Sequence, residues 1–292
     1  MSSSTHHRHG DSKRHERARR ILSFFLFLTV SLLSLSVCIR ASFVSKGAIV
    51  NTLTSDTYVQ GEYNSIKDYA HDLCDECSLP YDSVDKVITF DSVYKIQKAY
   101  INGILSASNE YTETTYKDYI ADLGKSIKKE TLLMLKQKNI DFYGKPDKAA
   151  ARFSDYITKY VTKVTELAFT NIVKTVVTFG SVASIIAIAV FVVIATVFVL
   201  FIVSIGKKLY RAVRDIAYSF YAASLLNLLL VSGVSVVKHY KHLWLYPLYF
   251  SNAILEYVSR CIASVGVSSA VLFVIGIALT TAVWCMKRNE NS

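Results

Sequence analysis

The chain has 292 residues, of which 52% are hydrophobic and 19% charged, and its formal net charge is +10. This composition excludes a disordered chain, a collagen-like repeat and a cysteine-dense disulfide scaffold. The hydrophobic residues are unevenly spread along the chain, which indicates a membrane protein rather than a soluble globular one.

Residues 1–20 form a basic tail with six Lys/Arg and two acidic residues. We expect no nucleic-acid partner for this tail, because the positive charge of the whole chain follows the pattern of a membrane topology signal. Metal binding by the tail is a further alternative. No folded frame fixes the imidazoles there, so we favour a solvated arm and expect no metal. The tail histidines are His6, His7, His9 and His15.

Four uncharged stretches are long enough to cross a bilayer, at residues 21–39, 175–206, 216–237 and 261–286. A helix needs about 20 apolar residues to cross about 30 Å of hydrocarbon. We therefore predict four transmembrane helices. A cleaved signal peptide is the alternative for the first stretch, but its 19 residues exceed the usual apolar region and the cleavage sequence is poor, which favours an uncleaved anchor.

Residues 40–174 carry equal numbers of basic and acidic residues and are numerous enough to form a domain. Apolar residues recur there every three or four positions, as in Val93, Ile96, Tyr100 and Ile104, which predicts a helical bundle. Pro146 is expected in the first turn of a helix. We expect residues 48–61 to be extended or irregular, and the last helix of this domain to continue into the second transmembrane helix.

Cys74 and Cys77 form a CxxC pair in this domain. A structural disulfide is favoured over free thiols, redox chemistry and a metal site, in that order. The surrounding acidic residues Asp72, Asp75 and Glu76 would raise the thiol pKa and oppose a redox role. Four spans with an outer CxxC are nevertheless similar in layout to the quinone-coupled disulfide oxidases, which implies a membrane thiol-disulfide oxidoreductase as one alternative.

The basic residues predict the orientation of the chain. The two termini, 1–20 and 287–292, and the loop 207–215 together hold 12 Lys/Arg, whereas the loop 238–260 holds three. By the positive-inside rule, both termini and the 207–215 loop are expected in the cytoplasm, with 40–174 and 238–260 outside a plasma membrane. The basic side chains of the cytoplasmic loop are candidates for coupling to a partner, namely Lys207, Lys208, Arg211 and Arg214.

Two further predictions concern residues at particular depths in the membrane. Asn227 is the strongly polar residue in mid-span, and we expect it to bond to a neighbouring helix. The outer loop 238–260 is rich in aromatic residues, which prefer the headgroup zone, so we expect it to lie along the membrane interface. The aromatic candidates are Tyr240, Trp244, Tyr246 and Tyr249.

The sequence therefore predicts an all-α membrane protein with four transmembrane helices and a helical extracytoplasmic domain between the first two. No Walker A, HExxH, GxSxG or Rossmann glycine pattern is present, so we expect no enzyme and no cofactor. The favoured function is an accessory for extracytoplasmic binding, sensing or assembly that couples to a membrane or cytoplasmic protein partner. The order of parts also resembles the cell-division permease-like family, which implies a membrane subunit of an ABC-type complex, although that family's outer domain is mixed α/β.

Overall fold

The computed structural model describes the chain in segments separated by short gaps. The backbone is described for residues 5–106, 109–137, 145–167, 170–206, 208–237 and 246–291. Side chains are described from residue 16 onward within these segments, except at 109–114, 235–237 and 290–291.

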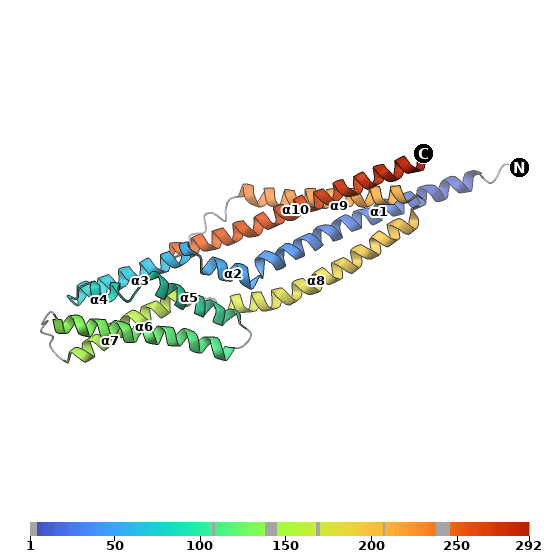
Figure 1. Ribbon diagram of the computed structural model, residues 1–292. Helices are drawn as coiled ribbons and strands as arrows, with labels where there is room; N and C mark the ends of the chain where they lie inside the picture. Colours follow the sequence, from blue (N-terminus) through green and yellow to red (C-terminus); the bar gives the residue numbers. More distant parts are fainter. Residues whose placement is uncertain are drawn as a thin grey trace. The chain divides into compact units, whose positions relative to one another are not determined.

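The described residues are almost entirely helical and contain no strand (Figure 1). The short elements are a π-helical turn η1 (Ile39–Phe43), α2 (Lys46–Leu53) and α4 (Asp82–Asp85). The helices of middle length are α3 (Asp56–Glu76), α5 (Phe90–Leu105), α6 (Asn109–Gln137) and α7 (Pro146–Thr165). The longest are α1 (Thr5–Cys38), α8 (Thr170–Ile205), α9 (Leu209–Val237) and α10 (Leu248–Asn291).

Four helical stretches are long and apolar enough to cross a membrane. They are Glu16–Phe43, Pro146–Ile205, Leu209–Val234 and Leu248–Asn289. Each contains all or most of one stretch predicted from hydropathy. The agreement arises because runs of apolar residues without charge specify both the helix and its length. The coarse prediction of a helical protein with four candidate membrane spans is therefore confirmed.

The chain folds into two compact units. The first, the bundle unit, comprises Met1–Ser45, Phe179–His242 and Val258–Ser292. The second, the helical unit, comprises Lys46–Thr178 and Leu243–Tyr257. Because each unit has its own buried core, each is described separately below.

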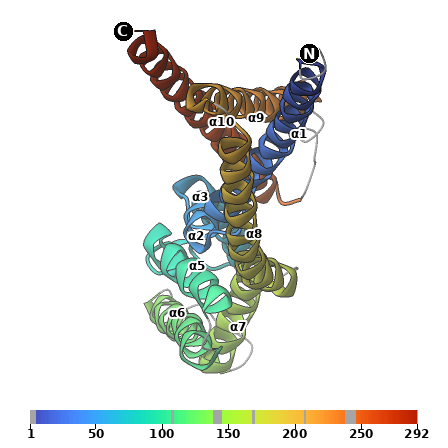
Figure 2. The same cartoon turned by 90° about the vertical axis from the view of Figure 1, so that its right-hand side faces the viewer.

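In the bundle unit, α1 packs along α9, and polar contacts join both helices to α10 (Figure 2). The apolar core between them includes Leu26 and Val30 of α1 and Ile216 of α9, all buried. Ile202 of α8 is fully buried in the same cluster. Most of the apolar surface of α8 is exposed, with Phe179 72% and Leu200 63% accessible, so this helix must be covered by something other than the chain itself.

The helical unit is built from amphipathic helices whose apolar stripes meet in one core. Helix α6 packs between α5 and α7, and α7 also packs against α3 (Figure 2). The predicted stripe of α5 is buried at Val93 and Ile96, with Tyr100 and Ile104 partly buried against the same core. Pro146 occupies the first turn of α7, as expected for a residue whose missing N–H has no helical partner there.

The prediction of irregular structure at residues 48–61 is wrong, because this stretch forms α2 and the start of α3. The polar residues of this stretch include the start of helix α3, which composition alone does not reveal. The hydroxyl of Ser55 caps α3 by accepting a hydrogen bond from the Tyr58 N–H at 3.4 Å. Leu53 and Val59 then bury their side chains in the core of the helical unit, and this burial offsets the weak helix propensity of the threonines.

The predicted continuity between the last helix of the domain and the second span is also wrong. Helix α7 ends at Thr165, Glu166 has an extended backbone (φ −73°, ψ 118°), and α8 begins at Thr170. A tyrosine from α5 stabilises this break, because the Leu167 N–H donates to the Tyr100 hydroxyl at 3.0 Å instead of to a helical carbonyl. Among the described residues, α7 and α8 are therefore separate helices.

Gly61 on α3 leaves room for the first turn of α10. A β-carbon at position 61 would overlap the β-carbon of Tyr249, whose ring packs edge-on against Tyr58 with centroids 5.3 Å apart. We expect Gly61→Ala to destabilise the protein by about 1–3 kcal/mol, the usual cost of overpacking a buried contact. Gly266→Ala is the matched control, because nothing lies within 4 Å of its added methyl. Equal thermal unfolding of the two variants would contradict this packing.

Candidate functional site

The CxxC pair lies at the end of α3, where the chain turns sharply. Ser78 has a positive φ of 54°, its N–H donates to the Asp75 carbonyl, and the Leu79 N–H donates to the Cys74 carbonyl at 2.8 Å. This double hydrogen bond is the pattern that closes a helix at a left-handed residue. It directs Cys74 into the core, fully buried, and leaves Cys77 half-buried.

The two thiols are not bonded to each other, so the expected disulfide is absent. Burial raises the pKa of Cys74 to about 11, and burial together with Glu76 raises the pKa of Cys77. Both thiols are therefore protonated at neutral pH and are weak nucleophiles. The Cys74 Sγ instead lies 3.7 Å from the Ser83 Oγ, a contact within the core that fixes its orientation.

A cavity of about 680 Å³ lies beside Cys77, between α3, α6 and α7. Its size is within the range of sites that bind small molecules. Its apolar wall is formed by leucines of α3 and α6 and by the buried ring of Phe153 on α7. Its polar lining contains Thr131, Lys145, Lys148, Arg152 and Glu76. This cavity is the candidate functional site, because α3, α6 and α7 position most of its lining; Cys77, Leu79 and Lys145 lie just beyond the helix ends.

Thr131 is the unusual member of the lining. It is only 1% exposed, and its hydroxyl has no hydrogen-bond partner within the described part of the chain. A threonine inside a helix commonly bonds to the carbonyl four residues earlier, so an unpaired hydroxyl at a cavity wall is costly in the empty state.

Glu62 on α3 is a second buried polar group without a partner. Its side chain is fully buried, and neither carboxyl oxygen has a hydrogen bond within the described residues. Burial raises the pKa of Glu62 well above its usual value, and the nearby Tyr58 hydroxyl offsets only part of this rise. Burial therefore favours the protonated, neutral form of the Glu62 carboxyl over the charged form.

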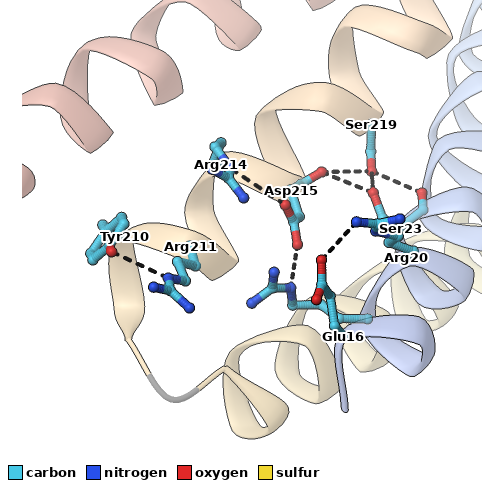
Figure 3. A network of polar contacts seen from close by, with 9 residues as sticks. Glu16, Arg20, Ser23, Tyr210, Arg211, Arg214, Asp215 and Ser219 are labelled. Atoms are coloured by element: carbon cyan, nitrogen blue, oxygen red, sulfur yellow. Dashed lines mark hydrogen bonds and ion pairs between the residues drawn. The ribbon is translucent and has the colours of Figure 1, made fainter. Parts of the chain in front are cut away.

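The bundle unit contains a buried ion pair between Arg19 of α1 and Asp215 of α9. Each side chain is only 12% exposed. Figure 3 shows Asp215 with its surroundings. Beside this pair, the hydroxyls of Ser23 and Ser219 lie 2.8 Å apart, and Ser219 also donates to the Ser23 carbonyl at 2.8 Å. Sequence reasoning counted Asp215 only as one charge of a loop, so it missed this contact.

Asn227 bonds to the neighbouring helix α1 inside the bundle. Its Oδ1 accepts from Ser31 Oγ at 2.8 Å, and its Nδ2 donates to Ser34 Oγ at 3.0 Å. The Ser34 hydroxyl also contacts Ser268 of α10. The side chain is fully buried, so these bonds satisfy the polar groups that burial removes from water.

The predicted coupling residues are found near the start of α9. Lys207 lies outside the described residues. Lys208 and Arg211 lie 5.8 Å from the centre of the Tyr210 ring, and Arg211 also donates to the Tyr210 hydroxyl at 3.2 Å (Figure 3). The Arg214 Nε lies 3.7 Å from Asp215. These cations are thus exposed at one end of α9 but held by aromatic and acidic neighbours.

The four aromatic candidates differ in placement. Tyr240 and Trp244 lie outside the described residues. Tyr246 is 98% exposed, whereas Tyr249 packs against Tyr58 within the helical unit. Both described tyrosines line a second cavity of about 410 Å³ in that unit.

The comparisons with known proteins identify no relative. No protein-family model, curated protein or solved structure matches the chain. The class of protein is therefore defined by the fold alone: a helical protein with four helices that could span a membrane.

Proposed function

We propose that the chain is a non-enzymatic multi-pass protein of the plasma membrane, and that its helical unit is an extracytoplasmic binding module. The excess of Lys/Arg in the two termini and the 207–215 loop supports a cytoplasmic location for those segments. The exposed apolar side chains of α8, such as Phe179 and Leu200, support a lipid environment, because water would not tolerate so large an apolar surface.

The cavity of about 680 Å³ is the observation that carries the binding role. Most of its lining comes from three helices that also form the core, so packing fixes most of its shape. Its lining combines apolar side chains with a few polar ones, the composition typical of small-molecule sites. Ligand occupancy would then be communicated to a membrane or cytoplasmic partner, for which the basic residues at the start of α9 are the proposed contact.

The thiol oxidoreductase alternative is disfavoured by the chemistry of the CxxC pair. A redox cysteine needs a lowered pKa, whereas the pKa of both Cys74 and Cys77 is raised. The ABC-type alternative has no observation in its favour beyond the order of parts.

The test uses a substitution that fills the cavity in the full-length protein. Ala149 of α7 lines the cavity, and a phenylalanine there would occupy the space of a ligand. We expect a library of small organic molecules to include compounds that raise the melting temperature of the wild type in lipid nanodiscs. A ligand at about 100 times its Kd adds about 2.7 kcal/mol of stability. Ala149→Phe should lose this response.

Ala121→Phe is the control, because Ala121 is exposed on α6 and does not line the cavity. It should respond to the same compounds as the wild type. A library that stabilises neither protein, or that stabilises Ala149→Phe as strongly as the wild type, would refute the binding role of the cavity.

A further inference from the structure

We propose that the cavity of the helical unit binds a small organic anion, in which a carboxylate, phosphate or sulfonate is attached to an apolar body. This inference rests on the proposed binding function and specifies the ligand class. Two features of the cavity support it, namely the charge of its lining and the first turn of α7, and its apolar wall fits the body of such a ligand.

The charge of the lining is mainly positive and comes from one helix face. Lys148 and Arg152 are four residues apart, so their side chains share one side of α7, and Lys145 precedes the helix at its capping position. Against these three cations, Glu76 is the one acidic residue of the lining among the described residues. A negatively charged group would find charge-assisted hydrogen bonds here that a neutral group would not.

The first turn of α7 adds to the positive potential. Lys145 occupies the capping position, but its side chain does not cap the helix, and Pro146 follows it. The helix has 20 residues, so its positive end is fully developed. Asp147 in the first turn reduces this potential but does not line the cavity.

The remaining wall is compatible with an apolar body and adds no negative charge. Leu73, Leu135 and Phe153 line it, together with the rings of Tyr69 and Tyr156. The Cys77 thiol stays protonated at neutral pH because burial and Glu76 raise its pKa. It therefore does not repel an anion.

The experiment compares two probes of equal shape, 2-naphthoate and the neutral 2-naphthamide. Binding is measured by calorimetry on the full-length protein in phosphatidylcholine nanodiscs, with empty nanodiscs subtracted. We expect naphthoate to bind at least about tenfold more tightly, since one charge-assisted hydrogen bond accounts for about that factor. Nanodiscs that also contain phosphatidylglycerol distinguish the source of the anion, because weaker naphthoate binding there would identify an anionic lipid as the competitor.

Three variants test the assigned residues. Lys148→Gln and Arg152→Gln should each weaken naphthoate binding about tenfold and leave the affinity for the amide unchanged. Lys159→Gln is the matched control on the same helix, because Lys159 pairs with Asp155 and does not line the cavity.

The outcomes separate this inference from the proposed function. If acid and amide bind equally, and Ala149→Phe abolishes both, the cavity is a binding site but not for anions. If Lys159→Gln weakens naphthoate binding as much as Lys148→Gln does, the effect comes from the general surface charge. The assignment of Lys148 to the anion site is then wrong. If no compound of any charge binds the cavity, the proposed function fails as well.

Discussion

Asp215→Asn is expected to destabilise the bundle unit by about 3–5 kcal/mol, the usual cost of removing one partner of a buried ion pair. The reason is that the Arg19 guanidinium would remain among packed helices, 12% exposed, without its carboxylate. The Ser23–Ser219 contact beside the pair should loosen as well, because it depends on the same approach of α1 to α9. Unfolding in mixed micelles of increasing denaturing detergent measures the loss.

The matched control is Arg20→Gln, which breaks a pair on the same helix. Arg20 contacts Glu16 at 2.6 Å, but both side chains are well exposed, so we expect less than about 1 kcal/mol. The swapped double variant, Arg19→Asp with Asp215→Arg, should recover much of the stability lost by Asp215→Asn. Equal effects of Asp215→Asn and Arg20→Gln would show that the Arg19–Asp215 pair does not hold α1 to α9.

Glu62→Gln is expected to be more stable than the wild type by a margin that grows as the pH rises. The folded-state pKa of Glu62 lies well above its ordinary value of 4.5. Between these two values the folded protein keeps the proton while the unfolded chain has lost it, so unfolding releases a proton. The stability of the wild type therefore falls with rising pH, by up to about 1.4 kcal/mol for each unit. Glutamine does not titrate and avoids this loss.

Thermal unfolding of both proteins from pH 5 to pH 8 measures the margin. At the acid end, wild type and Glu62→Gln should be close, since a protonated carboxyl and an amide are both neutral. Glu76→Gln is the control, because Glu76 is an exposed acidic residue on the same helix. A margin between Glu62→Gln and wild type that stays constant or shrinks with rising pH would mean that Glu62 is not buried in neutral form.

The long amphipathic helices and the four candidate spans could be predicted because local patterns determine them. The Val93–Ile96 stripe of α5 and the apolar run of α8 are visible within one or two helical turns of sequence. The missed helix at 48–61 shows the limit of this reasoning. Its stability comes from Leu53 and Val59 meeting partners distant in the chain, and composition does not encode those contacts.

The candidate site was less accessible from sequence than the fold. The CxxC pair drew attention to the correct turn, but the free state of the thiols depends on how the end of α3 aims Cys74 into the core. The cavity joins α3, α6 and α7, which are far apart in sequence, and no motif links Thr131 to Arg152. The cations at positions 145, 148 and 152, near the start of α7, were the sequence feature that could have indicated this part of the cavity.

The hydroxyl–amide contacts of Asn227 contain no group that ionises near neutral pH. Their strength is therefore insensitive to proton and salt concentration, unlike that of a charged pair. The Arg19–Asp215 pair lies between the same two helices, and because each side chain is only 12% exposed, salt screens it far less than an exposed pair. We therefore expect changes in ionic strength to leave the contact between α1 and α9 largely intact.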